Sequence, residues 1–516
     1  MNTISKAKTF AAALLLGLSL PSCNDWLDVD MEDQVLESAL FSDYEGYCTA
    51  LNGVYLSMND IYSTSLTTTV LDIMAQYYNV TTANNHKFKL YSSYTYSDNE
   101  FETTNANVWA RCYTLIANVN MVIERTEGET PLTERQRAII RGEALALRAF
   151  IHFDLLRLYG PIYSENPTAE SIPYYKSSSR EIQPILPADQ ALANVIADLR
   201  EAETLLKGYD PIITEGVRNT SVVENGLSSY DLSFRQLRMN YYAVQAMLAR
   251  AYLWQGDKAT AYDIAKHNII DKVTTEELEV FPWTTQSQVE DKDKPDYLFS
   301  SEVIFSLYNT KRLTNVRDPF FAPTLAAKTS RLTFFGTDMQ SATSKMPSFY
   351  DDLNNDLRAK MWEVVEPTDE EKKAAEESWW APAATNTLAL KKYDDIQSGN
   401  STETYRYMIP LIRMSEVYFI AAECATSQAE GCELINTVRN HRLCSSMKDT
   451  DDFNTVLTYE MAREVIGEGQ LFYFYKRRAA EQLISGTAAT PYTMIKTNYV
   501  WPIPKAETDK RANINK

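Results

Sequence analysis

The sequence predicts a fold dominated by α-helices, with tetratricopeptide-like helical repeats separated by irregular, loop-rich inserts. Two observations favour this class. Glycine is scarce, with 16 residues in 516, and long stretches repeat their apolar residues with a helical period rather than in alternation. A β-sandwich or a doubly wound sheet would instead contain runs of strand-like sequence, bounded by turn residues. Hydrophobic residues make up 45% of the chain, which is enough for a large core.

The first 22 residues have the pattern of a lipoprotein signal peptide. Lys6 and Lys8 precede an apolar stretch over residues 10–20, and a small residue precedes Cys23. The stretch is too short to span a bilayer, since about 20 residues are needed, but it suits a cleaved leader. We therefore expect removal of residues 1–22 and lipidation of Cys23. An ordinary secretory leader with a coincidental cysteine is the alternative, and secretion follows from either.

The charge of the chain limits its partners. Without Lys6 and Lys8 the 50 basic residues become 48 against 69 acidic ones, so the net charge changes from -19 to -21. A strongly acidic protein repels phosphate backbones and anionic headgroups. We therefore expect no nucleic-acid partner, and membrane contact through the lipid anchor only.

The helical pattern is clear over residues 142–159. Ala144, Leu147 and Ile151 fall on one stripe of a helix, and Phe150 belongs to a second stripe. Two apolar faces predict neighbouring elements on two sides.

Residues 240–270 have the spacing of a tetratricopeptide helix-turn-helix. Ala249 and Ala261 are small enough for paired helices to approach closely. Gly256 and Asp257 supply the turn, since glycine readily adopts the left-handed conformation that ends a helix. Such units need about three copies to bury a continuous core. The other expected units are residues 109–125 with 134–159, residues 190–206, and residues 413–442.

Three irregular segments, at about residues 77–102, 160–187 and 276–400, separate these units and are dense in Tyr, Trp, Phe, Asn and Pro. Long inserts of this kind usually carry function. We therefore expect the binding residues to lie on them.

Motifs for catalysis or metal binding are missing from the sequence. It contains no H-E-x-x-H, no G-x-S-x-G and no phosphate-binding glycine loop, and its four histidines are scattered. The five cysteines after Cys23 show no paired C-x-x-C spacing. We predict no cofactor, no metal and no catalytic residue. Buried free thiols are the expected state of these cysteines, with a Cys432–Cys444 or a Cys424–Cys432 bridge as the alternative.

Short motifs follow one another along almost the whole mature chain. They are Gly142-Glu143-Ala144, Arg148-Ala149-Phe150, Phe153-Asp154-Leu155, Tyr159-Gly160-Pro161, Ser301-Glu302-Val303-Ile304-Phe305-Ser306, Asp356 with Arg358, Ile409-Pro410-Leu411-Ile412-Arg413, residues 464–469, and Trp501-Pro502-Ile503-Pro504. In order and spacing, and in their position after a lipidation signal, they resemble the motifs of the SusD/RagB outer-membrane lipoproteins.

The resemblance implies a fold, a location in the outer membrane and a transporter as partner. It implies four tetratricopeptide-like units that support a more irregular binding half. Residues 23–516 would form a single SusD-like domain, with an N-terminal part over about 23–270 and a C-terminal part over about 271–516. Members of the family cover a TonB-dependent transporter of the SusC type as a lid. They capture glycans, or in one branch peptides, without catalysis.

Aromatic residues on the inserts are the candidates for a glycan site, because sugar rings stack on Trp and Tyr while amides and charged groups bind their hydroxyls. In family members with known glycan sites, the first and last inserts converge. The candidate ligand-binding residues are Tyr77, Tyr78, Asn84, Trp283, Trp379 and Trp380.

Three other functions stay open at this point. One is peptide binding within the same family. Another is a surface glycosidase, because two suitably spaced carboxylates suffice for hydrolysis and the chain has 69 acidic residues. The last is a structural protein that binds only the transporter or another surface component.

Overall fold

A computed structural model gives the structure of the chain. It describes residues 39–80, 86–218, 222–224, 227–229, 232–275, 278–320, 331–341, 343–378, 384–396, 403–448, 450–488 and 490–514. The longer helices are α3 (Tyr44–Tyr62), α6 (Asn99–Arg125), α7 (Glu134–Tyr159), α8 (Ala188–Leu206), α10 (Tyr241–Gln255), α16 (Met414–Cys424), α17 (Gln428–His441), α18 (Phe453–Val465) and α20 (Lys505–Ile514). The shorter helices are α4 (Leu71–Met74), α5 (Lys89–Ser92), α9 (Ile212–Glu215), α11 (Lys258–Tyr262), α12 (Asp271–Val273), α13 (Gln286–Val289), α14 (Met346–Phe349), α15 (Asp369–Glu377) and α19 (Leu471–Arg477).

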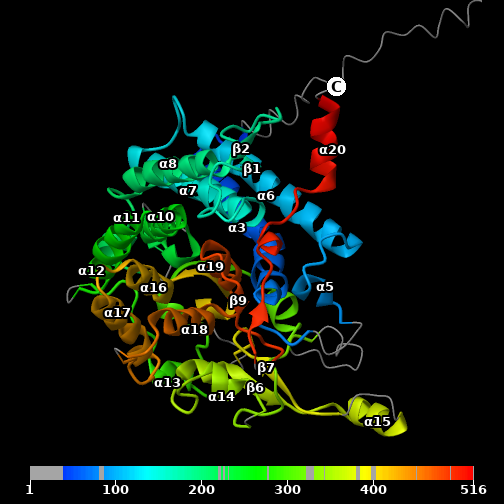
Figure 1. Ribbon diagram of the computed structural model, residues 1–516. Helices are drawn as coiled ribbons and strands as arrows, with labels where there is room; N and C mark the ends of the chain where they lie inside the picture. The colour runs from blue at the N-terminus through cyan, green and yellow to red at the C-terminus, as the bar shows by residue number, and fades with distance from the viewer. Residues whose placement is uncertain are drawn as a thin grey trace, which may run out of the picture.

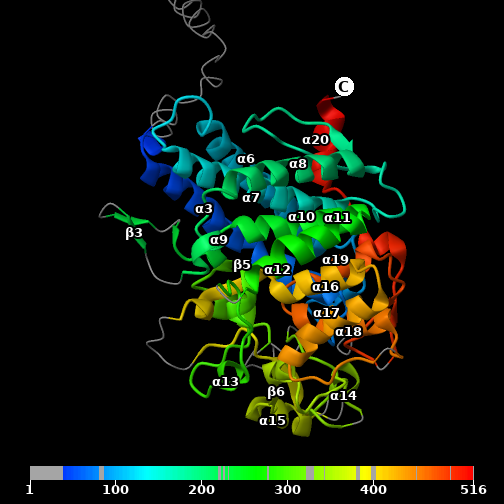
Figure 2. The ribbon, with the colours of Figure 1, turned by 90° about the vertical axis from the view of Figure 1, so that its left-hand side faces the viewer.

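The long helices form one continuous array, which confirms the predicted fold class (Figure 1). Helix α7 packs between α6 and α8, α8 packs on α10, and α10 packs on α16, which in turn contacts α17 and α18. Figure 2 shows these helices as successive layers, with α13, α14, α15 and the strand β6 (Trp362–Val365) gathered at one end. The irregular half is thus carried at one end of a helical scaffold.

Helix α7 shows how local sequence sets this packing. The Thr133 hydroxyl accepts a hydrogen bond from the Gln136 backbone N–H at 3.3 Å, and the Thr133 N–H donates to Gln136 Oε1 at 2.9 Å. This capping box satisfies donors at the helix start. A Cβ on Gly142 would lie 2.8 Å from Leu206 Cγ. Glycine there lets α7 and α8 approach closely, as neighbours on two sides of α7 require.

The predicted helix-turn-helix is confirmed over residues 240–270. Asn240 caps α10 through the Ala243 N–H at 3.0 Å, and Gly256 ends the helix with φ +91°. Asp257 then caps α11 through the Thr260 N–H at 3.0 Å, and a π-helical stretch over Asp263–Ile270 continues it. Ala261 is fully buried, consistent with close helix pairing.

Strands contribute only two-stranded antiparallel ribbons in the described parts of the chain. The central ribbon pairs β5 (Val303–Tyr308) with β8 (Met408–Arg413), with Val303 opposite Arg413 at one end and Tyr308 opposite Met408 at the other. The remaining pairs are β1 (Glu170–Pro173) with β2 (Ile185–Pro187), β3 (Val222–Glu224) with β4 (Leu227–Ser229), β6 with β7 (Thr387–Leu390), and β9 (Gln482–Leu483) with β10 (Tyr492–Thr493).

The cysteines after Cys23 are all free thiols, so neither of the two bridges forms. Cys432 and Cys444 are buried, as is Cys424, whereas Cys48 is half-buried. Buried thiols behave as small apolar side chains.

A buried ion-pair network joins the central ribbon to the last helices of the array. Glu464 on α18 accepts hydrogen bonds from Arg442 Nε at 2.8 Å, from Arg413 Nη1 at 2.9 Å and from Arg358 Nη1 at 3.1 Å. Both terminal nitrogens of Arg442 also donate to the Glu302 carboxylate, at 2.8 and 2.6 Å. All five side chains are almost fully buried.

The network balances its charges internally. Its cations are Arg358, Lys392, Arg413, Arg439, Arg442 and Arg463, and its carboxylates are Glu302, Asp356, Glu460, Glu464 and Glu468, with half-exposed Asp351 at the edge. Burial by itself would raise the pKa of Glu460, but the guanidinium groups of Arg358, Arg463 and Arg439 outweigh burial and lower that pKa to about 2. Every buried carboxylate of the network therefore has a cation in contact.

Replacement of Glu464 by Gln should lower the free energy of unfolding by about 3–5 kcal/mol, because removing one partner leaves buried cations uncompensated. Urea denaturation of the protein from Asn24 onward, followed by circular dichroism, measures this loss. The matched control is Glu433→Gln on exposed α17 surface, which should change stability by no more than about 0.5 kcal/mol. Equal urea midpoints for the two variants would show that the network does not stabilise the fold.

Acid should weaken the fold between about pH 4.5 and pH 2. The folded pKa of Glu460, about 2, lies below its ordinary value of 4.5, so the unfolded chain binds this proton more tightly. The stabilisation is complete above pH 4.5 and is lost as the pH falls through 2. For this carboxyl it amounts to about 3 kcal/mol, at about 1.4 kcal/mol per tenfold change in proton affinity. Urea midpoints over pH 2–7 measure it. The urea midpoint of Glu460→Gln should be lower at pH 7 and should fall less steeply with acid than that of the parent. Equally steep falls in the two proteins would assign the acid sensitivity to other carboxyls.

Candidate functional site

The structure places Tyr77 and Tyr78 in the core, each 1% exposed. The Tyr77 hydroxyl donates to the Ala462 carbonyl at 2.6 Å, and the Tyr78 hydroxyl donates to Asp72 Oδ2 at 3.1 Å. Gly486 packs on the Tyr77 backbone so closely that a Cβ would lie 1.8 Å from its carbonyl oxygen. The prediction that this pair stacks on a ligand is therefore wrong, because both rings and both hydroxyls are used inside the protein.

The buried Asp72 explains why this segment turns inward. Its carboxylate accepts the N–H groups of Gly467, at 2.5 Å, and Gly469, at 3.0 Å. Both glycines have positive φ, +83° and +72°, a conformation that side chains disfavour. Burial raises the pKa of Asp72 to about 8, although these hydrogen bonds oppose the shift. The Gly467–Gly469 turn thus binds a carboxylate of the protein itself.

Trp283 is half-buried, and one face of its ring is already occupied. It stacks on His441 with centroids 4.4 Å apart and planes 9° apart, and Tyr418 lies 5.2 Å away. The Arg442 guanidinium lies 5.5 Å from the indole. Trp283 therefore covers the edge of the ion-pair network, and its role in ligand binding stays a prediction.

The remaining predicted residues, Cys23, Asn84, Trp379 and Trp380, lie outside the described residues, so their roles stay predictions. The first and last inserts do meet in the described chain. His86 Nε2 lies 3.1 Å from the Arg331 carbonyl oxygen, and the Asn79 N–H donates to the Thr333 carbonyl at 2.7 Å.

Two adjoining clefts lie beside the central ribbon, and one of them is lined by Met408 of β8 and by Ser300, just before β5. Both are lined by Tyr405, just before β8. The arginine cleft has a volume of about 270 Å³, and the polar cleft has a volume of about 600 Å³. The main residues of the arginine cleft are Lys292, Tyr297, Arg312, Glu363, Lys391, Asp394, Asp395 and Tyr405. Those of the polar cleft are Gln236, Asp291, Lys294, Asp296, Ser300, Glu403 and Tyr405.

Arg312 is the central residue of the arginine cleft. It is 2% exposed, and its Nη1 donates to the carbonyls of Tyr405 at 2.9 Å and Met408 at 3.3 Å, while Nη2 donates to the Asp394 carbonyl at 3.2 Å. Within the described chain it forms no ion pair, and its Nε has no hydrogen-bond partner. Burial lowers the pKa of Arg312 to about 10, because the nearest carboxylates, Asp395, Asp296 and Asp394, compensate only part of the desolvation.

The polar cleft presents hydrogen-bonding groups held in place by their own contacts. Asp296 accepts the N–H and the hydroxyl of Ser300, at 2.9 and 2.8 Å. Burial raises the pKa of Asp296 to about 6, although these hydrogen bonds lower it. Lys294 pairs with Glu403 at 2.7 Å, and the Tyr405 hydroxyl donates to the Lys294 carbonyl at 2.8 Å. A cleft with one aromatic ring and several ordered polar groups suits a hydroxyl-rich ligand.

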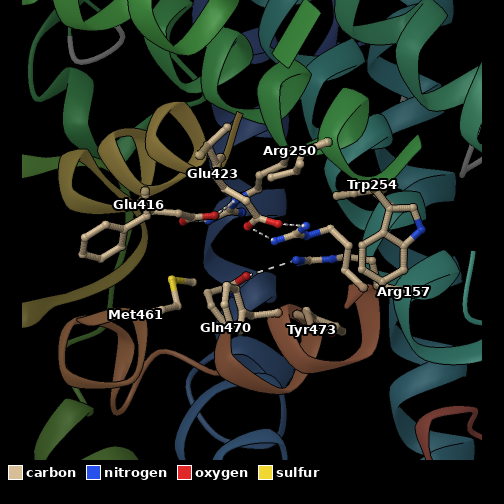
Figure 3. A pocket seen from close by; sticks show the side chains of 14 residues that line it. Arg157, Arg250, Trp254, Glu416, Glu423, Met461, Gln470 and Tyr473 are labelled. Carbon is tan, nitrogen blue, oxygen red and sulfur yellow. Dashed lines mark hydrogen bonds and ion pairs between the residues drawn. The ribbon is translucent and has the colours of Figure 1, made fainter. Parts of the chain in front are cut away.

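A third pocket, between α7, α10, α16 and α19, is shown in Figure 3 and has a volume of only about 50 Å³. Arg250 pairs with Glu416 at 2.5 Å, and Arg477 pairs with Glu423 at 2.6 Å. Arg157 lies over the Tyr473 ring at 3.7 Å. Ligand pockets are usually some 300–1,000 Å³, so this pocket is an internal seam of the helical array.

Two features are absent from the described part of the chain. Its side chains include no group of three His, Cys, Asp or Glu residues placed to hold a metal ion. None of its helices combines the length and the apolar character that crossing a membrane requires.

Comparison with known proteins gives consistent matches. The model of a family described as "Starch-binding associating with outer membrane" matches residues 25–253, and the model of the SusD family matches residues 332–516. No similar sequence is found among curated proteins.

Solved structures of similar fold extend over almost the whole chain. A SusD superfamily protein from Bacteroides thetaiotaomicron is 20% identical with a TM-score of 0.63, covering 91% of this chain and 98% of its own. A SusD-like carbohydrate-binding protein from Bacteroides vulgatus is 15% identical with a TM-score of 0.65, covering 92% and 97%. Surface glycan-binding protein A from Bacteroides thetaiotaomicron, in complex with laminarihexaose, is 17% identical with a TM-score of 0.56, covering 90% and 97%. With its helical array, its central ribbon and both matched segments, the chain belongs to the SusD/RagB family.

Proposed function

We propose that this protein is a non-catalytic surface lipoprotein that binds glycans at the joined arginine and polar clefts. The observation that carries the proposal is the shared Tyr405 wall, which joins the two clefts into one site of aromatic and hydrogen-bonding groups. Tyr297 adds a second half-buried ring. Rings of this kind stack on sugars, and fixed polar groups orient hydroxyls. The laminarihexaose complex of a relative with this fold supports the same ligand class.

We further propose that the protein is anchored in the outer membrane through Cys23 and delivers its ligand to a SusC-like TonB-dependent transporter. Family membership supports both statements, and the family description itself includes association with the outer membrane. A chain held by lipid and seated on a transporter would have its binding face beside the point of import.

Binding should be seen by calorimetric titration of the protein from Asn24 onward against neutral and acidic polysaccharides and mixed peptides, with product release assayed in the same samples. A glycan should bind without turnover. Tyr405→Ala and Tyr297→Ala should each weaken that binding about 10-fold, or ~1.4 kcal/mol, as expected for an aromatic contact at a binding site.

Tyr209→Ala is the matched control, because this tyrosine lies after α8 in the helical array, where its hydroxyl binds Glu134 at 2.7 Å. It should bind glycan as the parent does. Hydrolysis of any glycan by pure protein would contradict the non-catalytic role. Binding of peptides alone would move the protein to the peptide branch of the family.

Replacement of Cys23 by Ser should abolish lipid attachment, because serine has no thiol to acylate. Cells expressing the full-length chain, labelled with a radioactive fatty acid, should incorporate label into the parent protein and none into Cys23→Ser. The parent should sediment with outer membranes and co-purify with a β-barrel transporter. Cys48→Ser, which keeps the leader intact, should be labelled like the parent, and equal label in both serine variants and the parent would contradict the anchor.

A further inference from the structure

Arg312 differs from the buried arginines that stabilise the fold. In Arg148 the Nε and Nη2 edge binds Asp198 at 2.7 Å through both nitrogens, and in Arg250 the same edge binds Glu416 at 2.5 Å. In Arg312 that edge meets no carboxylate in the described chain: Nε is unpaired and Nη2 reaches only a carbonyl. A buried cation of this kind lacks the anion that normally compensates it.

Of the carboxylates that act on Arg312, Asp296 is held by hydrogen bonds from Ser300, whereas Asp394 and Asp395 are bound to other cations. Asp394 Oδ1 accepts from Arg317 Nε at 3.0 Å, and the Asp395 carboxylate binds Arg406 through two bonds of 2.7 Å. These carboxylates line the cleft, but their charge is shared with arginines that are not part of its wall.

The other charged residues of the cleft leave an excess of positive charge. Lys391 lies over the Tyr297 ring at 5.1 Å and, like exposed Lys292, forms no ion pair with a described residue. Lys392 is neutralised by Glu468 at 2.6 Å. The third acidic residue of the wall, exposed Glu363, forms no ion pair with a described residue. In a protein of net charge -19, a positive cleft is a local reversal that attracts anions.

We propose that the arginine cleft binds a sugar unit that carries an anionic group, so that the captured glycan is an acidic polysaccharide. The inference rests on the proposed function, since it assigns a ligand class to the same site. The guanidinium of Arg312 and the ammonium of Lys391 bind the anionic oxygens, because charge-assisted hydrogen bonds are stronger than neutral ones. The rings of Tyr297 and Tyr405 pack on the sugar ring. A uronate carboxylate and a sulfate ester share this chemistry.

The test uses calorimetry with three sets of probes: uronate polymers (polygalacturonate, alginate and hyaluronan), the sulfated polymer carrageenan, and the neutral polymers laminarin and starch. We expect an acidic polymer to bind, with affinity that falls as salt rises from 50 to 300 mM, because salt screens the attraction. Uronate binding without carrageenan binding identifies a carboxylate, and the reverse identifies a sulfate ester.

Variants of the wall make the test independent of folding. Lys391→Met removes a half-exposed cation and should weaken acidic-polymer binding about 5-fold, whereas Glu363→Gln removes a repelling charge and should strengthen binding about twofold. Arg312→Met should abolish most of the binding, with circular dichroism to confirm that it folds. Lys207→Met, an equal charge change on exposed surface after α8, should leave the affinity unchanged.

The outcomes separate this inference from the proposed function. Binding of neutral polymers alone, insensitive to salt and to Lys391→Met, would overturn the acidic ligand and leave glycan capture standing. Binding of none of these polymers would overturn both.

Discussion

The contact on which the rest of the structure depends is the set of ion pairs around the Glu464 carboxylate. Arg358, Arg413 and Arg442 reach it from three separate segments, and Arg442 extends the contact to Glu302. Removing each of these charges from water costs several kcal/mol, and only close pairing offsets that cost. A partial network would leave an isolated buried charge. The segments must therefore assemble together, which fixes where the central ribbon lies against α17 and α18.

The network and the clefts adjoin each other along one ribbon, because Lys392 of the network also lines the arginine cleft and Ser300, just before Glu302, lines the polar cleft. Glu302 precedes β5 and Arg413 ends β8, so the ion pairs fix the end where Val303 faces Arg413. The antiparallel register then carries this placement to Tyr308 and Met408, beside Tyr405 and the clefts. The ordered motifs that relate this chain to its family, such as residues 464–469, accordingly maintain the scaffold, while the residues of the clefts lie mostly between those motifs.

Sequence analysis predicted the helices well because their signals are local. The turn at Gly256 and the apolar stripes of residues 142–159 need no knowledge of distant residues. The fate of Tyr77 and Tyr78 does need it, since Asp72, Ala462 and Gly486 decide that their hydroxyls and rings are enclosed. The sequence around such a pair looks the same whether the two rings are buried or exposed. Arg312 was missed for the same reason: a single arginine gives no signal until its partners, or their absence among the described residues, are known.

Burial alone does not distinguish a structural arginine from a binding one, but the partners do. Arg442 and Arg312 are both almost fully buried. Burial alone would lower the pKa of each, but Glu302 and Glu464 outweigh burial and raise the pKa of Arg442, whereas the pKa of Arg312 is lowered to about 10. An uncompensated buried cation weakens the fold, and well-packed proteins avoid such groups outside functional sites. The neighbouring Glu464 network supplies stability, so the fold tolerates the Arg312 site. A ligand anion would complete at Arg312 the pairing that Glu302 and Glu464 provide within the chain at Arg442.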